Sequence, residues 1–122
     1  MPPEQIETLA LEIRKFLLEH DIWIDVDIYY NHKRIGQHDR ETGEFHYNDK
    51  DYLKVEEGVE PEDYFEYVNP EHILSMSFEG PVCHMLYYGT RQDVKREFDK
   101  IFEKYGLYYE MGDHWNMSCY FI

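Results

Sequence analysis

The sequence predicts an α+β fold, in which a mainly antiparallel sheet of about five strands is covered by two amphipathic helices and two short helices in a two-layer sandwich. Segments 4–19 and 90–105 place apolar residues at three- and four-residue steps, which is typical of amphipathic helices. Segment 22–30 instead alternates apolar and polar residues, which indicates a half-buried strand. Short turns join the strand segments and favour antiparallel pairing.

The N-terminal part is expected to form one helix and one strand. The helix runs from about Glu4 to Glu19, after two prolines that a helix start tolerates. In the strand, the alternation predicts a buried face of Ile22, Ile24, Val26, Ile28 and Tyr30. The opposite, solvated face is expected to hold Trp23, Asp25, Asp27 and Tyr29.

The middle of the chain predicts short elements. The polar stretch 33–47 is expected to form a return strand, a loop and a short strand at 44–47, followed by a possible strand at 52–56. Pro61 stands at a first helical position, with acidic residues in the first turn and Pro70 beyond the end. These signals predict a short helix from Pro61 to Val68.

The C-terminal half predicts a strand at 73–78 and a short helix at 80–88. Thr90 and Asp93 have the spacing of a capping box for the helix at 90–105, which Gly106 ends. The last two strands are expected to pair around a two-residue turn at Gly112-Asp113. Their buried face would hold Trp115, Met117, Cys119 and Phe121.

The composition is that of a single acidic domain over residues 1–122. The chain has 26 acidic and 12 basic residues, a formal net charge of -14, and 43% hydrophobic residues, which is too apolar for a disordered tail. A chain of this size can bury a core without metal or disulfide support, so we expect Cys83 and Cys119 to be reduced and buried. It has no long apolar run and no secretory signal, so we expect a cytoplasmic protein and no membrane contact.

The negative charge is concentrated in the middle of the chain. Residues 41–80 hold twelve acidic residues against two basic ones, which accounts for ten of the fourteen net charges. Such a surface repels nucleic acid and attracts a basic protein, and interspersed tyrosines add rigid contact area. We therefore expect the partner-binding residues to be Asp49, Asp51, Glu56, Glu57, Glu60, Glu62, Asp63, Tyr64, Glu66 and Tyr67.

Asp25 and Asp27 form a secondary acidic face. On one face of a strand their carboxylates would lie about 6.6 Å apart, a spacing that a divalent metal could use. A metal site needs further converging ligands, however, and the spacing of the nearby acids and histidines does not force them together. A metal-dependent enzyme using Asp25 and Asp27 is therefore an alternative to a solvated strand face.

No motif for catalysis or cofactor binding is present. The seven histidines include no His-x-x-x-His pair, and Ser75, Ser77 and Ser118 lie in strand patterns without a nucleophile elbow. The glycines form no phosphate-binding loop. We expect no enzymatic activity, no metal and no cofactor.

These observations favour a non-enzymatic inhibitor that occludes the nucleic-acid-binding surface of a bacterial DNA- or RNA-processing protein, of the anti-restriction or anti-CRISPR type found in phages and mobile elements. Carboxylates about 5–7 Å apart can take the places of phosphates, so the inhibitor would be a nucleic-acid mimic. An immunity or antitoxin protein that neutralises a basic toxin is the alternative. The chain could be a monomer or a homodimer with an apolar patch of Trp23, Tyr29 and Tyr120, and a second contact site could form at Lys33, Arg34 and Arg40.

Overall fold

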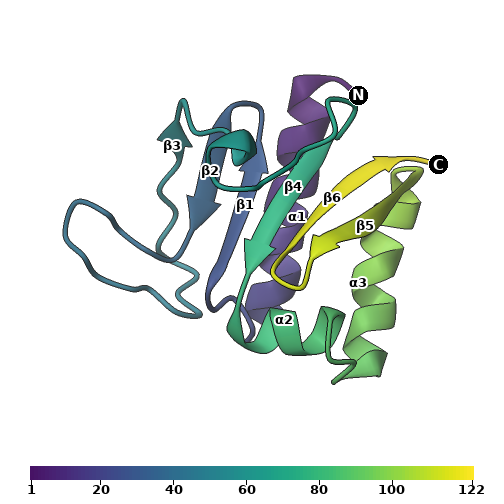
Figure 1. The fold of residues 1–122 in the computed structure, drawn as a ribbon. Coiled ribbons are helices and arrows are strands. Elements are labelled where there is room, and N and C mark those ends of the chain that lie inside the picture. The colour runs from purple at the N-terminus through teal and green to yellow at the C-terminus, as the bar shows by residue number, and fades with distance from the viewer.

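Six antiparallel strands form one sheet in the order β3-β2-β1-β4-β6-β5 (Figure 1). The computed structural model describes residues 1–122. Its strands are β1 (Val26–Tyr30), β2 (Lys33–Gly36), β3 (Glu56–Glu57), β4 (Leu74–Phe78), β5 (Leu107–Asp113) and β6 (Asn116–Phe121). Its helices are α1 (Pro3–Glu19), α2 (Gly80–Leu86), α3 (Gln92–Lys104) and the 3₁₀ helix η1 (Pro61–Asp63).

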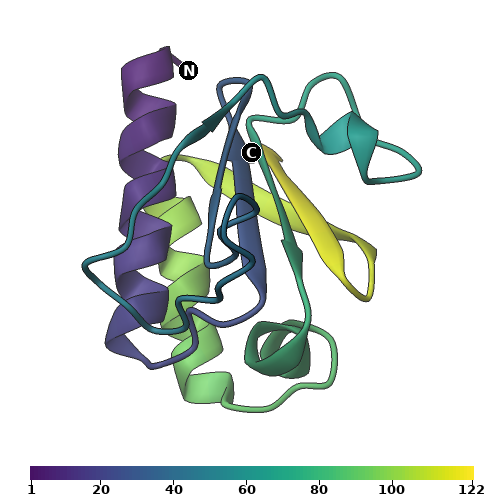
Figure 2. The same ribbon diagram turned by 90° about the vertical axis from the view of Figure 1, so that its left-hand side faces the viewer.

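Helices α1 and α3 cover one face of the sheet, and α2 closes one end (Figure 2). The apolar stripes of both helices and the inward-facing strand residues form one core, which includes Leu9, Ile13, Leu17, Ile28, Met76, Phe98, Phe102 and Met117. The other face carries no α-helix, and an irregular segment at 58–72 crosses it. The predicted α+β class, antiparallel pairing and two-layer arrangement are confirmed.

The strand predicted at 22–30 is shorter than expected. Strand β1 begins at Val26, because Asp25 adopts a left-handed φ of 56° that interrupts the extended backbone. The alternation also misplaced two aromatic residues, since both Trp23 and Tyr29 are buried. The apolar dimer patch that required them on the surface is therefore not formed, and Tyr120 is half-buried.

The short elements of the middle segment are reduced further. The helix predicted at Pro61–Val68 consists only of η1, which ends at Asp63, so Glu62 and Glu66 do not share a helical face. The strand predicted at 44–47 is a single bridge between His38 and Phe45. The strand predicted at 52–56 is the two-residue β3.

Two local signals near the C-terminus were also wrong. Arg91, with φ of 48°, occupies the N-cap of α3 and makes no side-chain cap bond, so the capping box does not form. Strand β5 extends through Asp113, which moves the hairpin turn to His114-Trp115. The Asp113 carboxylate accepts a hydrogen bond from the His114 backbone N–H, which holds this turn. Met117 and Cys119 face the core as predicted, whereas Trp115 is half-buried and Phe121 is exposed.

Cys83 and Cys119 are buried and unpaired, as the sequence predicted. Burial raises the pKa of Cys119 to about 12, so this thiol stays protonated and behaves as an apolar core group. None of the helices combines the length and the apolar character that crossing a membrane requires.

Candidate functional site

The face of the sheet opposite α1 and α3 is the most chemically varied part of the molecule. Segment 58–72 is fixed on it by Phe65, which is only 6% exposed. The Phe65 ring packs edge-on against Tyr29 and Trp115, with 5.4 Å between ring centroids in both pairs. Buried aromatic pairs in this geometry stabilise beyond their buried area, so Phe65 is the main anchor of the segment.

A hydrogen-bonded chain fixes the end of the same segment. His72 Nδ1 lies 2.9 Å from Ser75 Oγ on β4, and Ser75 Oγ lies 2.6 Å from Ser118 Oγ on β6. Burial lowers the pKa of His72, although Glu62 and Glu60 oppose that shift. A neutral imidazole therefore bridges the segment to the sheet.

Glu56, predicted to bind a partner, is instead the centre of an internal ion cluster. Arg34 donates to it through Nε at 3.1 Å and Nη2 at 2.9 Å, and Arg40 Nη1 lies 3.0 Å away. Burial would raise the pKa of Glu56, but the contacts with Arg34 outweigh burial and lower it. Arg34 is buried in this cluster, so Lys33, Arg34 and Arg40 do not form one exposed basic patch.

Most of the other predicted partner-binding acids also have a basic neighbour within the chain. Glu57 lies 4.0 Å from Lys33, Asp51 lies 3.1 Å from Lys50, and Glu60 pairs with His32. His46 and His72 take the corresponding places beside Asp49 and Glu62, at 3.6 and 3.8 Å. Asp63 and Glu66 make no ion pair and are exposed, beside the exposed Tyr64 and Tyr67.

The end of segment 58–72 meets the C-terminal hairpin. Asn69, Glu71, Tyr108, Glu110, Tyr120 and Phe121 line one shallow depression. Partial burial raises the pKa of Tyr120, and the nearby Glu110, Tyr108 and Tyr67 add to the shift. We call the acidic and aromatic residues that segment 58–72 and the hairpin leave exposed or half-buried the acidic-aromatic surface; they are Glu62, Asp63, Tyr64, Glu66, Tyr67, Glu71, Tyr108, Glu110, Tyr120 and Phe121.

The hairpin residues of the acidic-aromatic surface were missed by sequence reasoning. One sequence signal could have found them: there is no Lys or Arg between Lys54 and Arg91, and none after Lys104. Both of these stretches contribute to the acidic-aromatic surface. Asp63, Glu66, Glu71 and Glu110 of this surface make no ion pair, whereas Glu62 lies 3.8 Å from His72 and the Tyr64 ring lies 5.0 Å from the Arg34 guanidinium.

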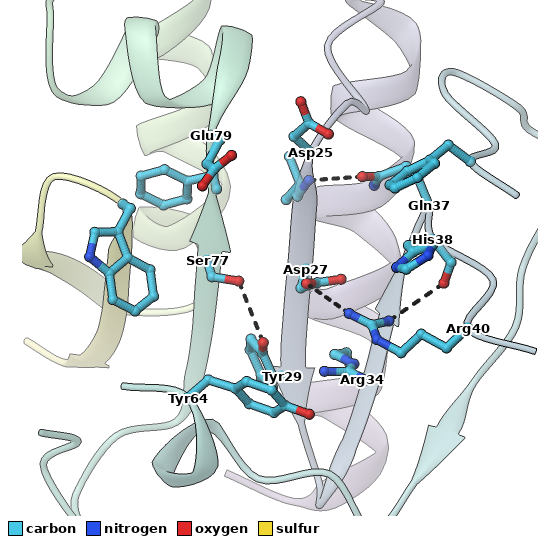
Figure 3. A pocket seen from close by; sticks show the side chains of 14 residues that line it. Asp25, Asp27, Tyr29, Arg34, Gln37, His38, Arg40, Tyr64, Ser77 and Glu79 are labelled. Atoms are coloured by element: carbon cyan, nitrogen blue, oxygen red, sulfur yellow. Dashed lines mark hydrogen bonds and ion pairs between the residues drawn. The ribbon is translucent and has the colours of Figure 1, made fainter. Parts of the chain in front are cut away.

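A separate pocket of about 380 Å³ opens on the same face between β1, β2 and β4 (Figure 3). Asp25 and Asp27 both line it, although Asp25 precedes the strand and the two carboxylates do not share a strand face as predicted. Burial raises the pKa of Asp27, and Arg40, whose Nη2 lies 3.7 Å from the Asp27 carboxylate, partly opposes the shift. Asp25 accepts a hydrogen bond of 2.7 Å from the Tyr47 hydroxyl.

No group of three or more His, Cys, Asp or Glu side chains is placed to hold a metal ion. The histidines considered as further ligands have other partners: His46 lies between Glu44 and Asp49, 3.6 Å from each, and His32 pairs with Glu60. The pocket thus combines carboxylates with guanidinium, amide and aromatic groups.

Comparisons with known proteins found no matching protein-family model, no matching curated protein and no matching solved structure. The geometry and charge of the chain's own residues are therefore the basis for a functional proposal.

Proposed function

We propose that the protein is a non-enzymatic inhibitor that binds a basic bacterial DNA- or RNA-processing protein and occludes its nucleic-acid-binding surface. The observation that supports this most directly is the acidic-aromatic surface, where exposed tyrosines accompany four carboxylates that make no ion pair, those of Asp63, Glu66, Glu71 and Glu110. A surface that served solubility alone would mix charges of both signs.

The acids of this surface remain available because few have partners inside the chain. Glu66, Glu71 and Glu110 are exposed and make no ion pair, unlike Glu56 and Glu57 on the edge strand β3. Exposed carboxylates without a basic partner attract a positively charged groove over the Debye length of about 8 Å. They accelerate association with a basic partner and disfavour contact with nucleic acid.

The aromatic residues supply contact area beside that charge. Tyr64, Tyr67, Tyr108 and Phe121 are all exposed, and tyrosine is among the residues most enriched in the cores of protein interfaces. Phe65 and the His72–Ser75–Ser118 chain hold the segment that carries two of these tyrosines. A preordered surface loses less conformational entropy on binding, which favours affinity.

Charge reversal with a matched control tests the proposal. The test variant combines Glu66→Lys, Glu71→Lys and Glu110→Lys, and the control combines Glu7→Lys, Glu19→Lys and Glu103→Lys on the exposed faces of α1 and α3. Both raise the net charge from -14 by the same amount. Tagged proteins are used to capture partners from bacterial lysate at low salt, and the captured protein is then purified with labelled nucleic acid bound to it.

The proposal predicts that the natural chain and the control capture the same basic protein and release nucleic acid from it, whereas the test variant does neither. Retention of the partner by the test variant would refute the role of the acidic-aromatic surface. A partner that binds no nucleic acid would refute occlusion, and a toxin as the captured protein would favour the immunity alternative instead.

A further inference from the structure

The pocket between β1, β2 and β4 has features that the acidic-aromatic surface does not explain. Figure 3 shows Asp25 and Glu79 at one end, Arg34 at the other, and Asp27 between them. Its volume of about 380 Å³ is that of a site for a small ligand or a single side chain.

The end formed by Asp25 and Glu79 carries uncompensated negative charge. The Glu79 backbone N–H donates to the Asp25 carbonyl oxygen at 2.9 Å, which holds the two residues side by side. The Glu79 side chain makes no hydrogen bond or ion pair, and the Asp25 carboxylate accepts one hydrogen bond, from the Tyr47 hydroxyl. Arg34 and Arg40, the basic residues of the pocket, are engaged by Glu56 and Asp27.

The same pocket contains two buried donors without acceptors. The Gln37 Oε1 accepts a hydrogen bond of 2.8 Å from the Val26 N–H, which fixes the amide and leaves Nε2 unpaired. Arg34 uses Nε and Nη2 for Glu56, and its Nη1 has no hydrogen-bond acceptor, although the guanidinium lies 5.0 Å from the centre of the Tyr64 ring. Both residues are only 2% exposed. Buried donors without partners are costly and rare in folded proteins, so a ligand that supplies acceptors is favoured.

Aromatic side chains form the walls of the pocket. Phe45 is exposed at its mouth, stacked on His38 with 4.3 Å between ring centroids, and Trp115 and Tyr64 line the opposite side. Aromatic faces attract guanidinium groups by cation–π contact. The Tyr64 ring already carries the Arg34 guanidinium. The pocket therefore offers carboxylates and the rings of Phe45 and Trp115 to a cation, and the Gln37 amide donor to a carbonyl oxygen.

We propose that this pocket binds an arginine residue of a peptide chain. The guanidinium lies between the carboxylates of Asp25 and Glu79, and a backbone carbonyl oxygen of the peptide accepts from Gln37 Nε2. Arginine fits better than lysine because its planar group donates to two carboxylates at once and stacks on aromatic rings. An anion is disfavoured because three carboxylates line the pocket. If the proposed function holds, this is where the basic partner inserts an arginine.

The test uses N-acetyl-arginine amide, with the neutral isostere N-acetyl-citrulline amide as the matched ligand. Binding is followed by NMR through the Gln37 side-chain amide and the Trp115 indole N–H, with the Trp23 indole, which is outside the pocket, as the internal reference. We expect saturable shifts at Gln37 and Trp115 only, and affinity for the citrulline compound at least roughly tenfold lower.

Variants locate the site. Asp25→Asn combined with Glu79→Gln removes the negative charge of two exposed side chains, and asparagine tolerates the positive φ of Asp25. This double variant should bind N-acetyl-arginine amide with an affinity at least roughly tenfold lower. Glu66→Gln combined with Glu71→Gln, on the acidic-aromatic surface, should leave probe binding unchanged. No shift at Gln37, equal binding of the citrulline compound, or unchanged binding by the first variant would overturn the assignment. These results do not depend on the partner, so the inhibitor proposal can fail while the arginine site stands, or the reverse.

Discussion

The carboxylate of Asp27 on β1 occupies the space that Gly36, its antiparallel partner on β2, leaves free by having no side chain. A Cβ at position 36 would overlap Asp27 Oδ1 and would lie 3.0 Å from the Val26 carbonyl oxygen. Gly36 therefore allows a half-buried carboxylate to lie against the sheet and face Arg40. The position of Asp27 in the pocket between β1, β2 and β4 depends on this close approach.

Gly36→Ala should therefore destabilise the protein by about 1–3 kcal/mol, the usual cost of forcing extra volume into a packed site. Urea denaturation measures the change in the free energy of unfolding. The matched control is Gly36→Ala in an Asp27→Ala background, where the overlapped oxygen is absent. If the two backgrounds lose the same stability, the overlap with Asp27 is not the cause, because coupled neighbours give non-additive changes.

Glu56→Gln should be far more damaging than its position on a two-residue edge strand implies. The substitution removes the carboxylate that neutralises Arg34, whose guanidinium stays buried, and breaking such a pair costs about 3–5 kcal/mol. Urea denaturation measures the loss in the free energy of unfolding. Glu57→Gln, next along the same strand and paired at 4.0 Å with Lys33 on the exposed surface, should cost less than about 1 kcal/mol. Equal losses for the two variants would contradict the internal role of Glu56.

The same cluster gives a signed pH dependence. The pKa of Glu56 in the folded chain lies below the ordinary glutamate value of 4.5, so its contribution to stability is complete above pH 4.5 and is lost as pH falls through the lowered pKa. The natural chain should lose its stability advantage over Glu56→Gln in that acidic range. A difference between the two proteins that stays constant on acidification would argue against charged pairing with Arg34.

Phe65→Ala should release segment 58–72 without unfolding the core. The substitution removes the ring that packs on Tyr29 and Trp115, and losses for buried phenylalanine are about 3–5 kcal/mol. Hydrogen exchange should accelerate within segment 58–72 and change little in α1 and α3. Tyr67→Ala, at a side chain that is 74% exposed, is the control and should change stability by no more than about 0.5 kcal/mol. Unaltered exchange in the segment would show that Phe65 does not anchor it.

Local patterns predicted the parts of the fold that depend on local periodicity. The helical spacing of Leu9, Ile13 and Leu17, and of Phe98 and Phe102, identified both covering helices, since burial on one helix face repeats along the sequence. The burial of Tyr29 could not be predicted this way, because the ring that covers it belongs to Phe65, far along the chain. Local signals also failed where backbone conformation intervened, as at Arg91.

Composition likewise predicted some residues of the candidate site and not others. Composition located the acidic middle of the chain, and Tyr64, Glu66 and Tyr67 are exposed there. Composition could not distinguish Glu56, which folding pairs with Arg34, from Glu66, which has no partner. Nor could it bring Glu110 and Tyr120 of the hairpin to Glu71, because that contact is set by the order of strands in the sheet.

His72 joins segment 58–72 to the sheet through its hydrogen bond with Ser75. Its pKa in the folded chain is lowered from 6.5 by burial, so the neutral form stabilises the segment above pH 6.5 and this contribution is lost as pH falls through the lowered pKa. Hydrogen exchange in the segment should therefore accelerate between pH 7.5 and 5.5, after correction for the intrinsic exchange rate. In His72→Gln, where the amide keeps a hydrogen-bonding group near Ser75 but does not titrate, this dependence should be absent. A pH dependence that persists in His72→Gln would show that His72 is not the group responsible.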